Sequence, residues 1–443
     1  MQAGIPTELG TEKISRLLKQ YAIPSIIAMS CSSLYNLVDS IYIGQFVGGY
    51  ALAGLALTFP LMNLGTAFSS LIAVGASANI GIFLGKKDYG NAQKVLGNVV
   101  TLNFIVGLLY MAGVLMFLDP ILTFFGASGN TLPHAREYMK IILYGNIISH
   151  TYFALNAVLR ATGLPKKAMR ASIYTVIINA VLDPVFIYYW GIKGAAIATV
   201  IAQGISLAWV VSILSNRDHV VHFQKGGYKL VSAIVKRILS VGMSPFFMNA
   251  TACLIVIAFN QGLKENGGDL AIAAYGISHK LTFLFIMVVM GLNQGMQPIA
   301  SYNFGAGLYE RLKKVVTYTA MCAIAVTTTG FIIAELFPKT LVMMFTTDEA
   351  LINEAIRGVR ISFMFYPIVG FQMVTSNFFR SIGYAGTAIF LSLTRQLIFV
   401  LPFIFIFPHF FGLDGIWASM PLADFTSCII SASIMIYHLK KLK

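Results

Sequence analysis

The sequence has very little charge for its length. Asp, Glu, Lys and Arg make up only 11% of its 443 residues, whereas 57% are hydrophobic. Soluble domains are about one quarter charged, so this composition excludes a water-exposed globular protein and indicates a polytopic membrane protein. The net charge of +14 does not indicate nucleic-acid binding, because Lys and Arg stand in short connections between apolar runs. A nucleic-acid binder would instead carry them on one face of a soluble fold.

Cysteines and enzyme motifs are equally scarce. The four cysteines all lie within apolar runs, where cysteine behaves as a small hydrophobe, so no disulfide framework is expected. No G-x-x-x-x-G-K-[ST], H-E-x-x-H or G-x-S-x-G motif occurs, which argues against ATP hydrolysis and common hydrolase sites. A membrane-embedded enzyme would need clustered His, Asp, Ser or metal ligands at a helix end, and none is found. We therefore expect a transporter without a cofactor, driven by an ion gradient.

Twelve apolar runs are each long enough to span a bilayer, which takes about 20 residues. The leader "TEKISRLLKQ" carries acidic as well as basic residues, and no small-residue cleavage pattern follows the first run. We therefore expect no cleavable signal peptide and a first run retained as a membrane helix. The sequence thus predicts an all-α membrane protein whose twelve helices are centred near Met29, Gly65, Gly107, Ile148, Ile178, Gln203, Cys253, Met287, Ile324, Gly370, Phe399 and Ser427.

The basic residues predict the orientation in the membrane. Most of the 31 Lys and Arg residues stand at the N-terminus, in the even-numbered connections and at the C-terminus. Such residues are retained on the cytoplasmic side. We therefore expect an integral plasma membrane protein with both termini in the cytoplasm, which agrees with an even number of helices. We also expect a monomer whose partners are the lipid bilayer and small molecules, with no nucleic acid.

The sequence repeats weakly at an offset of 220 residues. The segments "FLGKKDYGNAQKV" and "NFGAGLYERLKKV" follow the second run of each half, and "LRATGLP" and "FRSIGYA" follow the fourth. An even number of helices in each half makes the halves parallel repeats, as in many transporters. We predict an N-terminal six-helix bundle over residues 1–215, a cytoplasmic linker over 216–237 and a C-terminal bundle over 238–443.

One aspartate lies within an apolar run that is predicted to span the membrane. Asp39, in "NLVDSIYIG", lies within the first run, where a charge costs about 3 kcal/mol on insertion scales. In the fifth run Asn179 and Asp183 lie four residues apart on one helix face. Asn156 and Thr199 add neutral oxygens. Such a set can hold a proton or a hard cation such as sodium, while the alternative is that these residues only tie helices together.

Several stretches together resemble one transporter family. The stretches "YNLVDSIYIGQFVGGYALAGLALTFP", "NAVLDPVFIYYWGIKGAAIATV", "GLNQGMQPIASYNFGAG" and "RSIGYA" are similar to the multidrug and toxic compound extrusion (MATE) family. The resemblance covers nearly the whole chain. It implies two six-helix bundles arranged in a V, a central cavity, and export of amphipathic, mostly cationic compounds by alternating access, coupled to proton or sodium entry.

The resemblance also implies a coupling site in the N-terminal half. It assigns cation or proton coupling to Asp39, Asn179, Asp183, Asn156 and Thr199, with sodium, if it is the coupling ion, at the first three. A family subgroup that binds sodium in the C-terminal half needs acids in the seventh and tenth helices, and the stretches "MSPFFMNATACLIVIAFN" and "ISFMFYPIVGFQMVTSNFF" contain none. The alternative function is a flippase or exporter of lipid-linked saccharides or other metabolites. Such a flippase would be expected to use a more cationic cavity.

The C-terminal half holds a separate pair of opposite charges. Arg395 lies in the eleventh run and Asp424 in the twelfth. An unpaired buried charge is very unfavourable, so we predict that the two side chains form an ion pair. Two roles remain open for it: a structural link between helices, or a part in handling substrate or protons.

Overall fold

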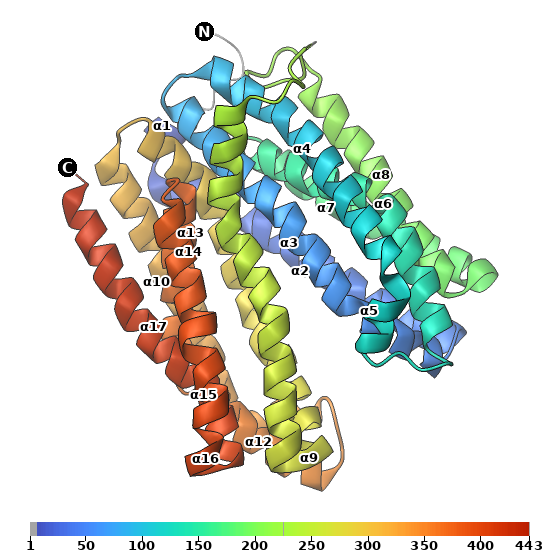
Figure 1. The fold of residues 1–443 in the computed structure, drawn as a ribbon. Helices are drawn as coiled ribbons and strands as arrows, with labels where there is room; N and C mark the ends of the chain where they lie inside the picture. The colour runs from blue at the N-terminus through green and yellow to red at the C-terminus, as the bar shows by residue number, and fades with distance from the viewer. Residues whose placement is uncertain (1–6, 225, 443) are drawn as a thin grey trace.

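The computed structural model describes residues 7–224 and 226–442, and the side chains of all of these except 34–38. Within this part of the chain every regular element is a helix. The predicted all-α class is therefore confirmed. The helices lie roughly parallel to one another and run between the two ends of the molecule (Figure 1).

The first nine apolar runs form long helices. Runs seven and eight lie together in α9 (Ser232–Gly305), which is broken at Gly268, where φ is 65° and ψ is −161°. The other seven are α2 (Ile14–Phe46), α3 (Gly49–Gly85), α4 (Tyr89–Met116), α6 (Leu132–Ala161), α7 (Pro165–Trp190), α8 (Ile192–Leu214) and α10 (Tyr309–Leu336).

Two of the last three runs are interrupted. The tenth is divided into α12 (Glu349–Phe363) and α13 (Tyr366–Ser381), and Pro367 in the first turn of α13 lacks the N–H that a continuous helix would use. The eleventh comprises α14 (Ala385–Leu393), the π-helix η1 (Thr394–Val400) and α15 (Leu401–Ile406). The twelfth is α17 (Leu413–Lys441). Short helices occupy connections: α1 (Glu8–Thr11), α5 (Leu118–Phe124), α11 (Pro338–Met343) and α16 (Pro408–Phe411).

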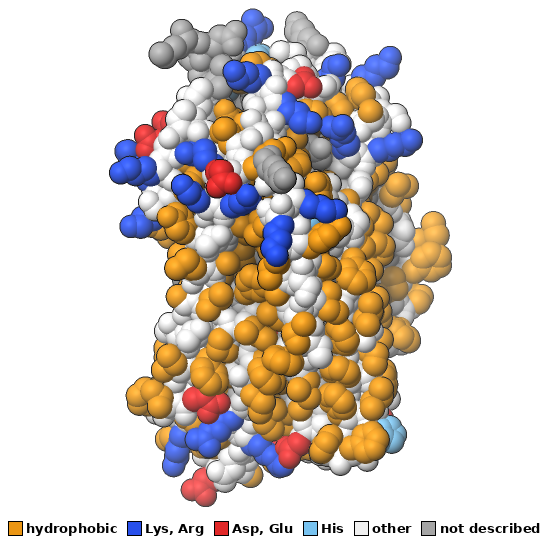
Figure 2. All heavy atoms as spheres, turned by 90° about the vertical axis from the view of Figure 1, so that its left-hand side faces the viewer, with side chains coloured by type: hydrophobic (Ala, Val, Ile, Leu, Met, Phe, Trp, Pro, Cys, Tyr) orange, Lys and Arg blue, Asp and Glu red, His pale blue; other side chains and the backbone are white. Residues whose placement is uncertain are grey.

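The helices have the length and composition of membrane spans. In the described chain, eight helical segments can each cross a membrane on these grounds, and one of them is α9, which holds two runs. The remaining three runs are α2, α6 and the run divided between α12 and α13, which have 15 and 16 residues. Figure 2 shows the matching surface: a belt of hydrophobic side chains lies between two charged ends, and Lys and Arg crowd the upper end.

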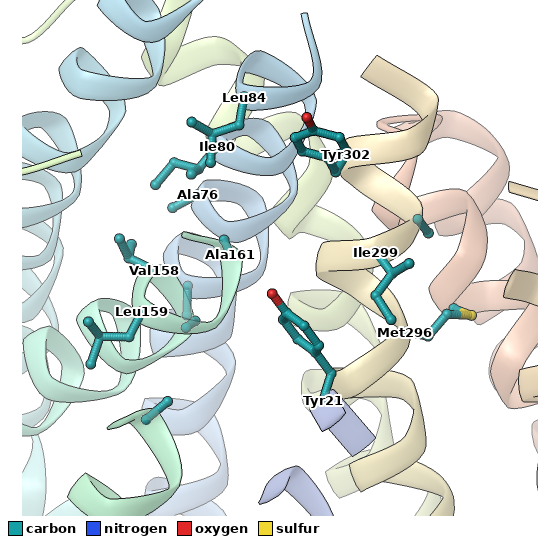
Figure 3. Close-up of a cluster of buried hydrophobic side chains, with 14 of the residues drawn as sticks. Tyr21, Ala76, Ile80, Leu84, Val158, Leu159, Ala161, Met296, Ile299 and Tyr302 are labelled. Carbon is teal, nitrogen blue, oxygen red and sulfur yellow. The ribbon is translucent and has the colours of Figure 1, made fainter. Parts of the chain in front are cut away.

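The two halves of the chain form two groups of helices. In Figure 1 the helices α2 to α8 lie on one side and α10 to α17 on the other. The groups approach each other at the end that carries both termini and diverge toward the opposite end. Near the first end a continuous hydrophobic cluster joins them (Figure 3): Ala76, Ile80 and Leu84 from α3 and Val158 from α6 belong to the same cluster as Ile299 from α9.

Glycines allow the backbones of the two groups to touch. A Cβ atom at Gly242 of α9 would lie 1.7 Å from the carbonyl oxygen of Leu71 in α3, and one at Gly75 of α3 would lie 2.0 Å from that of Ile238. Membrane helices pack tightly through such small residues because apolar side chains gain little by leaving lipid. The contact between α3 and α9 therefore depends on the absence of a side chain.

We expect Gly242→Val to force α3 and α9 apart. A side chain there meets backbone, which cannot rotate away, and overpacking costs about 1–3 kcal/mol. The thermal unfolding midpoint and the rate of transport should both fall. Gly276→Val is the matched control, because nothing lies within 4 Å of a Cβ at Gly276 on the same helix. Equal effects of the two substitutions would show that the close contact is unimportant.

The connection between the halves is fastened to α4. In its described part, residues 215–224 and 226–231, it contains no helix. Asn98 of α4 donates from Nδ2 to the carbonyl of Lys229 at 3.2 Å and accepts from the N–H of Val231 at 2.9 Å. Thr101 donates to the Tyr228 carbonyl at 2.7 Å. The first half thus sets where α9 begins.

Candidate functional site

Four of the five predicted coupling residues meet in the first half. Asp39 projects from α2, and Asn179 and Asp183 project from α7, one turn apart. Asn179 Nδ2 donates to Asp183 Oδ1 at 3.0 Å and to Thr199 Oγ1 of α8 at 3.4 Å. The Asp39 and Asp183 carboxyl groups lie within hydrogen-bonding reach of each other. Three helices therefore bring two acids, an amide and a hydroxyl to one point.

This cluster is buried and has acceptor oxygens to spare. Asp39 is 8% exposed, Asn179 1% and Asp183 0%. Among the described side chains and backbone groups, none donates a hydrogen bond to Asp39 Oδ1, Asp183 Oδ2 or Asn179 Oδ1. Among the described residues, no Lys, Arg or His forms an ion pair with either carboxylate.

These facts limit what the cluster can be chemically. Two buried carboxylates without a basic partner repel each other, and a hydrogen bond between two carboxyl groups requires a proton. Three free oxygens in one place are also suitable ligands for a hard cation. The site therefore has the chemistry to take up positive charge, as a proton or as a metal cation. A purely structural tie between helices would not leave so many acceptors unpaired.

Asn156 is not brought to this cluster. Its Nδ2 donates to the carbonyl of Ala168 at 3.0 Å, and its Oδ1 accepts from Arg160. Ala168 precedes Asn179 on α7 by 11 residues, which is about 16 Å along a helix axis. Asn156 thus lies toward the end with the termini. It lines a cavity of about 80 Å³ together with Arg160, Tyr152, Thr175 and Gln203.

The structure adds polar residues that the sequence analysis did not name. The Thr175 hydroxyl of α7 hydrogen-bonds with the Ser206 hydroxyl of α8 at 2.7 Å and the Tyr152 hydroxyl of α6 at 3.0 Å, and Ser149 hydrogen-bonds to Gln203. The signal that could have revealed them is periodicity. Thr175 precedes Asn179 by four residues, and Gln203 follows Thr199 by four, so both extend the polar faces of α7 and α8 by one turn.

In the second half, Arg395 and Asp424 form an ion pair. Arg395 Nε lies 2.5 Å from Asp424 Oδ1, and the side chains are 31% and 10% exposed. Arg395 belongs to the π-helix η1, a local distortion that is frequent at functional sites. Neighbouring polar contacts connect adjacent helices: Gln372 to Ser427, and Thr251 to Gln396.

Comparison with known proteins gives one family. The MatE family model matches residues 24–185 and 246–406. The multidrug export protein MepA of Staphylococcus haemolyticus (strain JCSC1435) is 26% identical over 432 residues, covering 96% of this chain and 94% of that protein. MepA of Staphylococcus aureus (strain bovine RF122 / ET3-1) is 26% identical over 441 residues, with the same coverage.

Solved structures share the whole fold. One, described as the outward-facing conformation of a multidrug resistance MATE family transporter of the MOP superfamily, superposes with a TM-score of 0.94 at 25% identity and covers 100% of both chains. A MOP superfamily transporter from Pyrococcus furiosus, described as having a binding pocket of reverse polarity that suggests a different function, also gives 0.94 at 25% identity, covering 100% of this chain and 99% of that one. Both likenesses extend from end to end of the chain.

Proposed function

Because the chain belongs to the MatE family of membrane transporters, we propose that it exports amphipathic, mostly cationic organic compounds in exchange for protons or sodium ions. The observation that carries this proposal is the buried Asp39–Asp183 pair, whose charge changes when a cation binds. The similarity to proteins named multidrug export proteins supports the substrate class. An acidic site in the first half favours cationic or neutral compounds over anions.

The charges at the two ends support an orientation. At the end opposite the termini, Arg136, Lys193, Arg357 and Arg360 are each paired with an acid. At the end with the termini, most basic residues have no acidic partner among the described residues. Lys and Arg are also more numerous at that end, and an excess of these residues marks the cytoplasmic side. With the termini in the cytoplasm, the end at which the helix groups diverge faces outward.

The exchange then follows alternating access. With the outer end open, Asp39 and Asp183 take up a proton or a sodium ion from outside, which removes the repulsion between them. Bound substrate leaves outward. The two groups of helices rock, the cation is released inward, and new substrate enters from the cytoplasm or the inner leaflet. Each ligand shifts the equilibrium only by its difference in affinity between the two states.

The test uses inside-out proteoliposomes containing the purified protein and a fluorescent organic cation. We impose a pH gradient or a sodium gradient separately and measure uptake. Uptake driven only by the pH gradient would identify the carboxyl pair as a proton site. Uptake driven only by sodium would identify a site formed with Asn179. If neither gradient drove uptake, the proposal would be wrong.

The alternative function, a flippase or exporter of lipid-linked saccharides or other metabolites, is favoured by one observation. The Pyrococcus furiosus transporter that shares the fold is described as having a binding pocket whose reverse polarity suggests a different function. The same proteoliposomes distinguish the two: a lipid-linked saccharide that moves between leaflets without either gradient would support the alternative.

A further inference from the structure

A cavity between the two groups of helices has no place in the exchange mechanism. Its volume is about 460 Å³, and its walls come from α3, from both ends of α9 and from the turn after α13. It lies at the end that carries the termini, where α3 ends and α9 begins. Its polar lining includes Asn79 and Ser240, and its charged lining is Lys86, Lys236 and Arg237.

The charge of this cavity is of one sign. No Asp or Glu lines it, and within the described residues none of its three basic side chains takes part in an ion pair. The Arg237 guanidinium lies over the ring of Phe83, 5.4 Å from its centre. Because Phe83 belongs to α3 and Arg237 to α9, this contact orients the guanidinium across the boundary between the two groups.

The related positions in the first half of the chain also line a cavity, and that cavity contains acids. The purely basic charge is therefore not a property that both repeats share. At the 220-residue offset, Arg16 corresponds to Lys236 and Gln20 to Ser240. Arg16 and Gln20 line a cavity of about 520 Å³ that also contains Glu8 and Glu12. There Arg16 is paired with Glu12 at 3.3 Å. Of these two corresponding cavities, the one lined by Lys86, Lys236 and Arg237 has no acid among its described lining residues.

The position of the three residues indicates what would bind. Lys86 directly follows the end of α3, and Lys236 and Arg237 lie in the first two turns of α9, next to the apolar stretch that begins at Ile238. They therefore stand at the boundary between the apolar belt and the charged end. Basic pockets at this depth bind anionic lipid headgroups, and a guanidinium fork with two ammonium groups suits a phosphate.

We propose that this cavity binds a phosphate-bearing anion, with the headgroup of an anionic phospholipid as the source that its depth favours. The anion bridges Lys86 on one group of helices and Lys236 and Arg237 on the other. Without it, three like charges repel one another across the contact between α3 and α9. The bound phosphate therefore stabilises the conformation in which the two groups meet at this end, which the proposed function would require to open in each cycle.

The test compares the full-length protein with the triple variant K86Q/K236Q/R237Q. The matched control is K94Q/K314Q/K440Q, which removes three exposed charges at the same end outside the cavity. Native mass spectrometry and thermal unfolding are measured with added phosphatidylglycerol, and separately with phosphatidylcholine and with glycerol 3-phosphate. We expect the wild type and the control to retain one phosphatidylglycerol molecule, and the triple variant to bind it at least tenfold more weakly. Phosphatidylglycerol should raise the thermal unfolding midpoint of the wild type and the control but not that of the triple variant.

The outcomes separate the sources of the phosphate. Selective binding of phosphatidylglycerol would support a lipid headgroup as the source of the phosphate. If the wild type and the control bound glycerol 3-phosphate and the triple variant did not, a soluble phosphate compound would be the ligand of the same site. Equal lipid retention by wild type and triple variant would overturn the proposal. Equal loss in triple variant and control would do the same, since it would mean general attraction to a positive surface. The single variant K236Q provides a milder test should the triple variant be poorly folded. None of these measurements depends on transport.

Discussion

Replacing Asp39 by asparagine should abolish transport driven by an ion gradient. The substitution keeps the shape of the side chain but removes the carboxyl group that gains and loses charge in the proposed mechanism. We expect the rate of gradient-driven uptake in proteoliposomes to fall at least tenfold, which corresponds to a rise of about 1.4 kcal/mol in the activation free energy of transport. Substrate binding, measured by fluorescence titration of the purified protein, should change much less, because the substitution affects coupling and not the presence of a cavity.

The control for this experiment is Asp269→Asn. Asp269 is exposed in α9, next to the break at Gly268, and the same chemical change there touches no buried acid. It should leave uptake unchanged. Asp183→Asn should behave like Asp39→Asn, since both carboxyl groups belong to the same cluster. If Asp39→Asn still accumulated substrate against its gradient, Asp39 would not be the coupling group.

Removing Asp424 should strongly destabilise the second half. Asp424→Ala leaves Arg395 without its partner at 2.5 Å inside the membrane-spanning part of the molecule. Breaking a buried ion pair by removing one partner costs about 3–5 kcal/mol, because the remaining charge stays desolvated. We expect a loss of this order in the free energy of unfolding, measured by denaturant titration in mixed micelles.

Two further variants separate stability from function at this pair. Asp414→Ala, also on α17, removes the partner of Arg357, but those side chains are 41% and 53% exposed. An exposed pair is worth about 0–1 kcal/mol, so this control should change little. The double variant Arg395→Met with Asp424→Leu should recover most of the lost stability, since no charge remains unpaired. Normal transport by the double variant would make the pair structural, and lost transport in a stable protein would make it functional.

The local structure of this protein was predictable because membrane helices depend on local composition. In lipid a helix must satisfy its own backbone hydrogen bonds, so an apolar run of sufficient length is enough to predict one. The twelve runs accordingly lie in helices of the structure. The pairing of Asn179 with Asp183 was also local, because four residues make one helical turn. The breaks within helices were harder to predict from the sequence, although Pro367 is a local cause of the break between α12 and α13.

Contacts between helices far apart in the sequence were decided only by packing. Asp39 was predicted to join Asp183 from its chemistry and from the family resemblance, but only the fold brings α2 against α7. Asn156 had the same chemistry, yet packing places its side chain against the Ala168 carbonyl of α7 instead. The basic cavity likewise lies where α3 and α9 meet, and their close approach at Gly242 and Gly75 brings Lys86 and Lys236 to one cavity. Sequence therefore determined the helices, their polar faces and the charge asymmetry, while tertiary structure decided which faces meet, since that depends on shapes and small residues at distant positions.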